Sequence, residues 1–285
     1  MKRLRKVFIN IVATLMFAVM CLGLTACEDI KKVELKLALY DYQNDVMFDE
    51  SEVTLTLELY RHLAPNTVDA IVGYVNDGYY NDTVFYKMSG YDTQIMLGDL
   101  KIVDGEIKQN DIMPAIDGEF KNGGTVGSNL LNRKGSVGLW RTWNAYDDTY
   151  KTNSATDSGR ATWFIPTDSI TNYNDWFCVF AQYDLDDESN TNAINAITNA
   201  FGTDGEYDEY VIYYTGTSDD YDASKPNHGL TFNYVEKADF DEDQIEDLFV
   251  AEDAEFVCYN HYTIKIPVTG QSGGIGAKVV SAKVI

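Results

Sequence analysis

Cysteine, histidine and basic residues are scarce in this sequence. It has four cysteines and three histidines in 285 residues, with no Cys-x-x-Cys pair, and its histidines are isolated at positions 62, 228 and 261. A disulfide framework needs several paired cysteines, and a structural metal site needs closely spaced Cys or His ligands. We therefore expect no disulfide framework, no metal and no cofactor.

The shortage of basic residues excludes a further class of partner. Lysine and arginine number 22 against 45 aspartates and glutamates, which gives a net charge of −23. A surface this acidic repels polyanions and anionic lipid headgroups. Nucleic acid is therefore not an expected partner, and the charge mainly favours solubility.

The N-terminus has the layout of a secretory signal, with the basic stretch 1–6 followed by the apolar stretch 7–24. The apolar stretch ends in Leu24-Thr25-Ala26-Cys27, which resembles the lipobox of bacterial lipoproteins. The sequence thus predicts a signal peptide over 1–26, lipidation of Cys27 and a short linker over 27–32. The alternative is an uncleaved transmembrane helix, for which the apolar length is borderline.

Cleavage of the signal peptide changes the composition of the mature chain. Loss of its four basic residues takes the net charge from −23 to −27, and Cys21 leaves with it. With Cys27 lipidated, Cys178 and Cys258 remain. These two either pair in an exported protein or, since Cys178 lies in an apolar run, leave Cys178 as a small buried side chain.

The first part of the mature chain predicts two strands and a helix. Apolar residues alternate with other residues over 33–39 and again over 53–59, as in half-buried strands. Pro65 then opens a predicted helix that Gly78 closes. The apolar residues of this helix have i, i+3, i+4, i+7 spacing: Val68, Ile71, Val72 and Val75.

From this helix onward the sequence resembles the cyclophilin family of peptidyl-prolyl cis-trans isomerases. Blocks similar to the family's motifs occur in the family's order over residues 53–182. They are Ala64-Pro65-Asn66-Thr67, Gly78-Tyr79-Tyr80, Phe85-Tyr86-Lys87, the strand 134–139, the strand 158–165 and the segment 173–181.

The resemblance implies a mainly β domain over 33–285, a closed antiparallel β-barrel capped by helices. A helical face of Ala193, Ile194, Ile197 and Phe201 matches the family helix that follows the segment 173–181. Either 262–266 or 277–285 is expected to supply the closing strand. Residues 202–256 have no family counterpart and are expected to form an acidic insertion outside the barrel core. The run Asp239 to Asp243 lacks the glycine and the twelfth-position acid of a calcium loop.

Prolyl isomerisation needs no nucleophile. The barrier of about 18–20 kcal/mol comes from the double-bond character of the C–N bond. Catalysis therefore needs an apolar pocket for the proline ring and a donor that favours the twisted transition state. In cyclophilins this donor is an arginine, and the resemblance assigns its place to Lys87. Lysine keeps the charge but lacks the planar fork of donors. Lys87 is thus either a weaker donor or an exposed lysine in a domain without catalysis.

The resemblance also assigns the substrate-binding residues. These are Phe85, Tyr91, Gln94, Met96, Leu139, Trp140, Thr162, Phe164 and Phe177. Gln94 and Met96 compete for the place of a family glutamine. Thr162 replaces another glutamine, and Trp140 replaces a small alanine beside the peptide groove, which it could narrow. Each large apolar residue could instead serve core packing alone.

The function that follows is isomerisation of X-Pro bonds in exported proteins by a lipoprotein on the outer face of the cell membrane. Its partners would be proline-containing peptides or unfolded exported proteins. The main alternative is a peptide-binding or chaperone lipoprotein with weak or no catalysis. A lipid-anchored solute-binding protein is disfavoured, because no alternating βαβ pattern occurs.

Overall fold

The structure is a computed structural model that describes residues 31–41, 44–49, 52–121, 130–141, 158–202, 205–216, 231–241, 261–269 and 274–285. These all belong to one compact unit, Lys31–Ile285. The expected signal peptide, Cys27 and Cys258 lie outside the described residues. No described helix is long and apolar enough to cross a membrane.

The two predicted strands and the predicted helix are confirmed. Strands β1 (Lys31–Asp41) and β3 (Thr54–Leu59) pair antiparallel, and their alternating leucines are buried. Helix α2 (Pro65–Asn76) begins at the expected proline and buries Val68, Ile71 and Val75. Gly78 follows it with a φ of 74°, in the left-handed region that glycine adopts at low cost.

Helix α2 begins with a capping group that is distant in sequence. Its N-cap residue, Ala64, has no side chain able to accept a hydrogen bond. Instead, the buried carboxylate of Glu119 accepts hydrogen bonds from the backbone N–H groups of Asn66 at 2.9 Å and Thr67 at 2.8 Å. These bonds satisfy two of the N–H groups that every helix leaves unpaired at its start.

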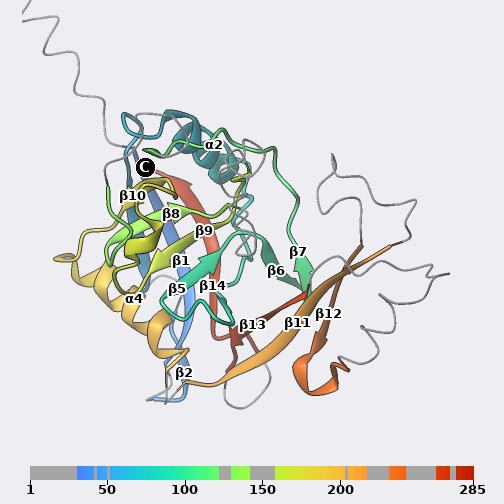
Figure 1. Cartoon of the computed structure of the whole chain (residues 1–285). Coiled ribbons are helices and arrows are strands. Elements are labelled where there is room, and N and C mark those ends of the chain that lie inside the picture. The colour runs from blue at the N-terminus through green and yellow to red at the C-terminus, as the bar shows by residue number, and fades with distance from the viewer. Residues whose placement is uncertain are drawn as a thin grey trace, which may run out of the picture. The chain divides into compact units, whose positions relative to one another are not determined.

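A sheet of eight strands forms the body of the unit. Its main path runs β14-β1-β3-β10-β8-β9-β5, and the short β2 (Val46–Met47) pairs with β1. The other members of this path are β14 (Ala277–Val284), β10 (Val179–Gln182), β8 (Ser136–Leu139), β9 (Trp163–Pro166) and β5 (Gln94–Leu97). Helix α2 packs against β14, and α4 (Glu188–Asn199) packs against β3 and β1. The two helices lie near the top and at the lower left of Figure 1.

The sheet is a curled half-barrel and not the closed barrel that the resemblance implied. Among the described residues, the edge strands β14 and β5 are joined by no continuous ladder; isolated bridges connect Val84 to Lys278 and Tyr86 to Met96. The ladder does not continue because the chain leaves this sheet directly after Tyr86. The next residues form β4 (Lys87–Met88), which pairs with β13 (His261–Pro267) of a second sheet.

The second sheet has the order β12-β11-β13-β4, with β11 spanning Tyr207–Thr215 and β12 spanning Thr231–Glu236. It lies beside the curled sheet (Figure 1). The expected closing strand is therefore 277–285, because β14 pairs with β1 whereas β13 belongs to the second sheet. A hairpin of β6 (Leu100–Val103) and β7 (Glu106–Gln109), and the short 3-10 helices η3 (Thr171–Tyr173) and η5 (Lys237–Asp239), complete the described elements.

The described part of segment 202–256 shares a core with the curled sheet. Ile212 of β11 is fully buried in a second hydrophobic core together with Met96 of β5 and Phe164 of β9. The expectation that this segment contributes to no shared core is therefore wrong. Apolar and aromatic side chains on one face of β11 pack inward although the segment as a whole is acidic.

Candidate functional site

The candidate site is built on strands β5, β8 and β9. Met96 of β5 and Phe164 of β9 are directly opposite each other, and Phe164 is opposite Gly138 of β8. Their neighbours Ile95, Leu97 and Ile165 belong to the first hydrophobic core, inside the curled sheet. Since successive side chains of a strand point to opposite faces, Met96 and Phe164 face the second core on the outer side.

Gly138 determines how closely the Phe164 ring approaches β8. A Cβ atom at position 138 would lie 2.4 Å from Cζ of Phe164. The absence of a side chain therefore lets the fully buried ring rest directly on the backbone of β8. The glycine acts here through its size, since its φ is not positive.

Five rings gather on this outer face and are called the aromatic cluster below: Tyr91, Trp140, Phe164, Tyr173 and Phe177. Tyr173 and Phe177 stack with their ring centroids 4.3 Å apart, and both meet Phe164 edge-on at 5.6 and 5.7 Å. The two edge-on separations lie within the favourable range for aromatic pairs, and the stacked pair is slightly closer. Phe164, Tyr173 and Phe177 are buried, and Tyr91 and Trp140 are partly exposed, so the cluster is a packed apolar group that reaches the surface at Tyr91 and Trp140.

Gln94 lies on the same face of β5 as Met96, two residues away. Its side chain is 1% exposed and faces the Tyr173 hydroxyl. Neither amide atom makes a hydrogen bond of ordinary length among the described residues. Burial, followed by the proximity of Tyr91, raises the pKa of Tyr173, so its hydroxyl stays protonated and can donate.

Lys87 lies at the edge of this region. Its ammonium donates to the carbonyl oxygen of Asp92 at 2.9 Å and lies 5.3 Å from the centroid of the Phe201 ring. Asp92 follows Tyr91 of the aromatic cluster in the chain. Burial lowers the pKa of Lys87. The negative charge of Asp92 opposes this shift. The positive charge of Lys265, which pairs with Lys87 from the neighbouring strand β13, lowers the pKa further.

Two of the residues assigned to the pocket lie on the opposite face from the aromatic cluster. Phe85 and Leu139 are buried in the first core instead. Their chain neighbours, Tyr86 and Trp140, pack with the second core. The alternation of side chains along the strand thus directs Phe85 and Leu139 to the other face.

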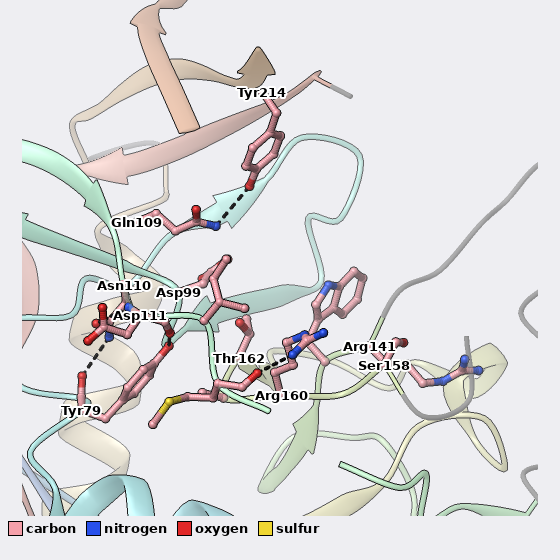
Figure 2. A pocket seen from close by; sticks show the side chains of 14 residues that line it. Tyr79, Asp99, Gln109, Asn110, Asp111, Arg141, Ser158, Arg160, Thr162 and Tyr214 are labelled. Atoms are coloured by element: carbon pink, nitrogen blue, oxygen red, sulfur yellow. Dashed lines mark hydrogen bonds between the residues drawn. The ribbon is translucent and has the colours of Figure 1, made fainter. Parts of the chain in front are cut away.

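Thr162 lines a neighbouring cavity together with Trp140. The cavity has a volume of about 260 Å³ and mostly polar walls, which include Asp99, Asn110, Arg160 and Tyr214 (Figure 2). The expected pocket residues are therefore divided between the aromatic cluster and this cavity. Gln94, Met96, Phe164 and Phe177 gather around the aromatic cluster, Thr162 faces the cavity, and Trp140 contacts both.

Asp99 is the unusual ionisable group of this cavity. Its carboxylate accepts hydrogen bonds from the Tyr86 hydroxyl at 2.8 and 3.0 Å. The side chain is partly exposed to the cavity but is otherwise surrounded by protein, and this burial raises its pKa to about 6. The Tyr86 hydrogen bond acts in the opposite direction and lowers the pKa.

Arg141 connects the cavity with the aromatic cluster. It lines the cavity, and its guanidinium lies 5.0 Å from the ring centroid of Phe177 and 4.6 Å from that of Phe120. Its Nε donates to the backbone oxygen of Trp176 at 2.7 Å. These contacts fix a positive charge beside the apolar surface.

Comparison with known proteins identifies this arrangement. The family model described as cyclophilin type peptidyl-prolyl cis-trans isomerase/CLD matches residues 45–212, which is more than half of the chain. The chain belongs to the cyclophilin-type peptidyl-prolyl isomerase family. The matched region includes Lys87 and the whole aromatic cluster. Peptidyl-prolyl cis-trans isomerisation is therefore the enzyme class of this chain.

Similar solved structures include two of a cyclophilin type peptidyl-prolyl cis-trans isomerase from Cryptosporidium parvum. One was determined in the presence of the dipeptide Ala-Pro; its sequence is 17% identical, its TM-score is 0.38, and the match covers 59% of this chain and 85% of that chain. The other has 16% identity and a TM-score of 0.39, with 60% and 85% covered. No curated protein matches the chain.

Sequence reasoning missed Tyr173, although the family pattern contains the signal. The segment 173–181 aligns with the family's Leu-Asp-Gly-x-Tyr-x-Val-Phe-Gly, which puts Tyr173 at the leucine and Asp175 at the glycine. Asp175 has a φ of 67°, in the left-handed region that favours glycine. The turn is thus preserved, and it brings Tyr173 back over Phe177.

Cys178 follows this turn and is a free, buried thiol. Its Sγ lies 3.7 Å from the Thr67 hydroxyl. Burial raises the pKa of this thiol to about 12. Of the two alternatives for Cys178, the described residues thus place it as a small buried side chain.

Proposed function

We propose that this cyclophilin isomerises X-Pro bonds of exported proteins at the outer face of the cell membrane. In this proposal the rings of the aromatic cluster other than Trp140 hold the proline ring, and Lys87 supplies the donor. The observation that carries it is the convergence of Met96, Phe164 and Phe177 on one outer face, beside the segment that contacts Lys87.

The aromatic surface supplies binding that does not depend on charge. A proline ring packed on buried rings leaves water, and its burial is favourable in proportion to the apolar area removed. Holding the ring while the preceding peptide group rotates is what the reaction needs, because no bond is made or broken. The twisted amide loses its double-bond character, so its nitrogen becomes able to accept a hydrogen bond.

Lys87 has donor capacity for that hydrogen bond. An ammonium has three N–H donors, and one is used on the Asp92 carbonyl. The remaining two are available to a prolyl nitrogen or a neighbouring carbonyl. The group has no planar fork to fix its orientation, so we expect stabilisation of the transition state to be weaker than with a guanidinium.

The test is turnover of the peptide Ala-Ala-Pro-Phe by the soluble chain that starts at residue 28. Loss of one oriented donor typically lowers a rate by about 10²–10³, so Lys87→Ala should remove most of the activity. Lys87→Arg should raise the activity above the wild-type level. Lys108→Ala is the matched control, because Lys108 is exposed on the β6–β7 hairpin and pairs with Glu106. Undiminished turnover in folded Lys87→Ala would remove Lys87 from the mechanism.

A second function, peptide binding without turnover, is favoured by one observation. Trp140 contacts every other ring of the aromatic cluster, so its indole already occupies part of the apolar surface. A peptide-binding or chaperone role would show as measurable binding of Ala-Ala-Pro-Phe with no turnover in wild type and none in Lys87→Arg.

The location outside the cytoplasm rests on the sequence of residues 1–27. Cys27→Ser should abolish incorporation of radioactive palmitate and release the protein from the membrane fraction. Lys31→Ala is a suitable control, because it leaves Leu24 to Cys27 intact. Equal labelling of Cys27→Ser and wild type would contradict the lipid anchor while leaving the isomerase proposal unaffected.

A further inference from the structure

Trp140 is packed into the surface that a proline ring would use. Its indole stacks on Phe177 with centroids 5.5 Å apart and planes inclined by 28°. It meets Phe164 edge-on at 6.2 Å and Tyr91 edge-on at 5.7 Å, and Tyr173 lies 6.4 Å away. These are the rings that the proposed function assigns to the proline, so an indole and a proline ring compete for the same contacts.

The backbone at Trp140 is fixed, so any movement must come from the side chain. Its N–H donates to the Thr162 carbonyl oxygen at 2.9 Å, which continues the pairing of β8 with the β9 segment. The next residue, Arg141, is buried and bonded to the Trp176 backbone oxygen. Rotation about the side-chain torsions is therefore the movement open to the indole.

A space for the rotated indole lies directly beside it. The cavity of about 260 Å³ that Trp140 and Thr162 line is large enough to hold an indole ring. Figure 2 shows this cavity between Asp99 and Tyr214 on one side and Arg160 and Ser158 on the other. Asn110 and Gln109 supply polar groups on its wall, and Trp140 itself is only partly buried.

We propose that Trp140 gates the proline site: its indole fills the site in the free protein and swings into the neighbouring cavity when a prolyl peptide binds. This proposal rests on the proposed function and adds a residue that determines specificity. A site that is open only part of the time binds its ligand more weakly by the fraction that is open. Wild type thus selects peptides whose contacts offset the displacement of the indole.

Removal of the indole should open the site. We expect folded Trp140→Ala to bind Ala-Ala-Pro-Phe roughly tenfold or more tightly than wild type, because the proline site is then open in every molecule. Its KM should fall correspondingly. Trp140→Val is a second variant that keeps an apolar side chain if Trp140→Ala fails to fold. Trp176→Ala is the control, as it removes an indole of the second core outside the aromatic cluster.

A second measurement uses free indole as a probe and does not depend on catalysis. An apolar space left by a deleted side chain can bind a small aromatic molecule. Indole should bind Trp140→Ala and not wild type, and it should compete with Ala-Ala-Pro-Phe for the variant. Both results together support the gate.

The outcomes that overturn the proposal are distinct from those that overturn the proposed function. If wild type turns over the peptide and folded Trp140→Ala binds it no better, the gate is wrong and the isomerase proposal stands. If indole binds Trp140→Ala but neither protein binds or turns over the peptide, the site is not a proline site. In that case the proposed function fails, and the gate fails with it.

Discussion

Asp99 offers a sharp test of how the polar cavity is built, because its ionisation should destabilise the fold. Burial raises the pKa of this carboxyl from 3.8 to about 6. The folded protein therefore holds the proton more tightly than the unfolded chain does. The stability that this group contributes is complete below about pH 4, where both states are protonated, and it is lost as the pH rises through about 6.

The size of the effect follows from the shift in pKa. A difference of about two pKa units corresponds to about 3 kcal/mol of unfolding free energy. Asparagine has nearly the same shape as aspartate, can still accept the Tyr86 hydrogen bond and cannot ionise. Asp99→Asn should therefore be more stable than wild type by up to about 3 kcal/mol at pH 7.5, and nearly equal to it at pH 4.

The measurement is urea unfolding of both proteins at intervals between pH 4 and pH 8. The difference between variant and wild type isolates Asp99, because the other carboxylates contribute equally to both. Asp111→Asn removes the same formal charge from the same cavity and serves as the control. A difference that stays constant with pH, or Asp99→Asn that is less stable at pH 7.5, would refute the reasoning.

Three further predictions concern packing and can be checked by urea unfolding. Gly138→Ala should cost about 1–3 kcal/mol, because the new Cβ overlaps the Phe164 ring; no loss would mean that the ring moves aside freely. Glu119→Ala should cost about 1–3 kcal/mol by leaving the first N–H groups of α2 without acceptors, whereas Glu119→Gln should restore part of this loss. Ile212→Ala should cost about 2–5 kcal/mol, since the side chain is fully buried, and a loss below about 1 kcal/mol would mean that β11 is not part of the core.

The elements with one exposed and one buried face were predictable from the sequence. In β3 and α2 the apolar residues repeat with the period of the element, because one face packs on the core and the other meets water. The order of the motif blocks also identified the cyclophilin family. It also predicted Met96, Phe164 and Phe177 as pocket residues, and the structure places these three together in the second core.

The direction of the pocket residues was not predictable from the strands that hold them. All residues of β5, β8 and β9 are buried on both faces, so burial does not separate an inner from an outer face in these strands. Leu139 of β8 could therefore be assigned to the wrong face. Only the packing of a second sheet on the outer side explains why both faces of these strands are buried.

The second sheet was not predicted from the sequence for a related reason. The acidic composition of segment 202–256 indicated a solvated loop, yet one face of β11 supplies Ile212 between tyrosines that pack on the second core. The two acidic residues of β11, Asp208 and Glu209, are adjacent, so the sequence shows no alternation of acidic and apolar residues that would reveal the buried face.

The sequence by itself determined the family, the first strands and helix α2, and it named every ring of the aromatic cluster except Tyr173. Local periodicity and motif order are properties of the chain, so they are visible before it folds. Tertiary structure alone decided that the curled sheet stays open where β4 departs to β13, and that Glu119 caps α2. It also decided that the indole of Trp140 packs against the other rings of the aromatic cluster. These features depend on which distant segments meet, because burial, hydrogen bonding and ring contacts between them are set by the three-dimensional packing.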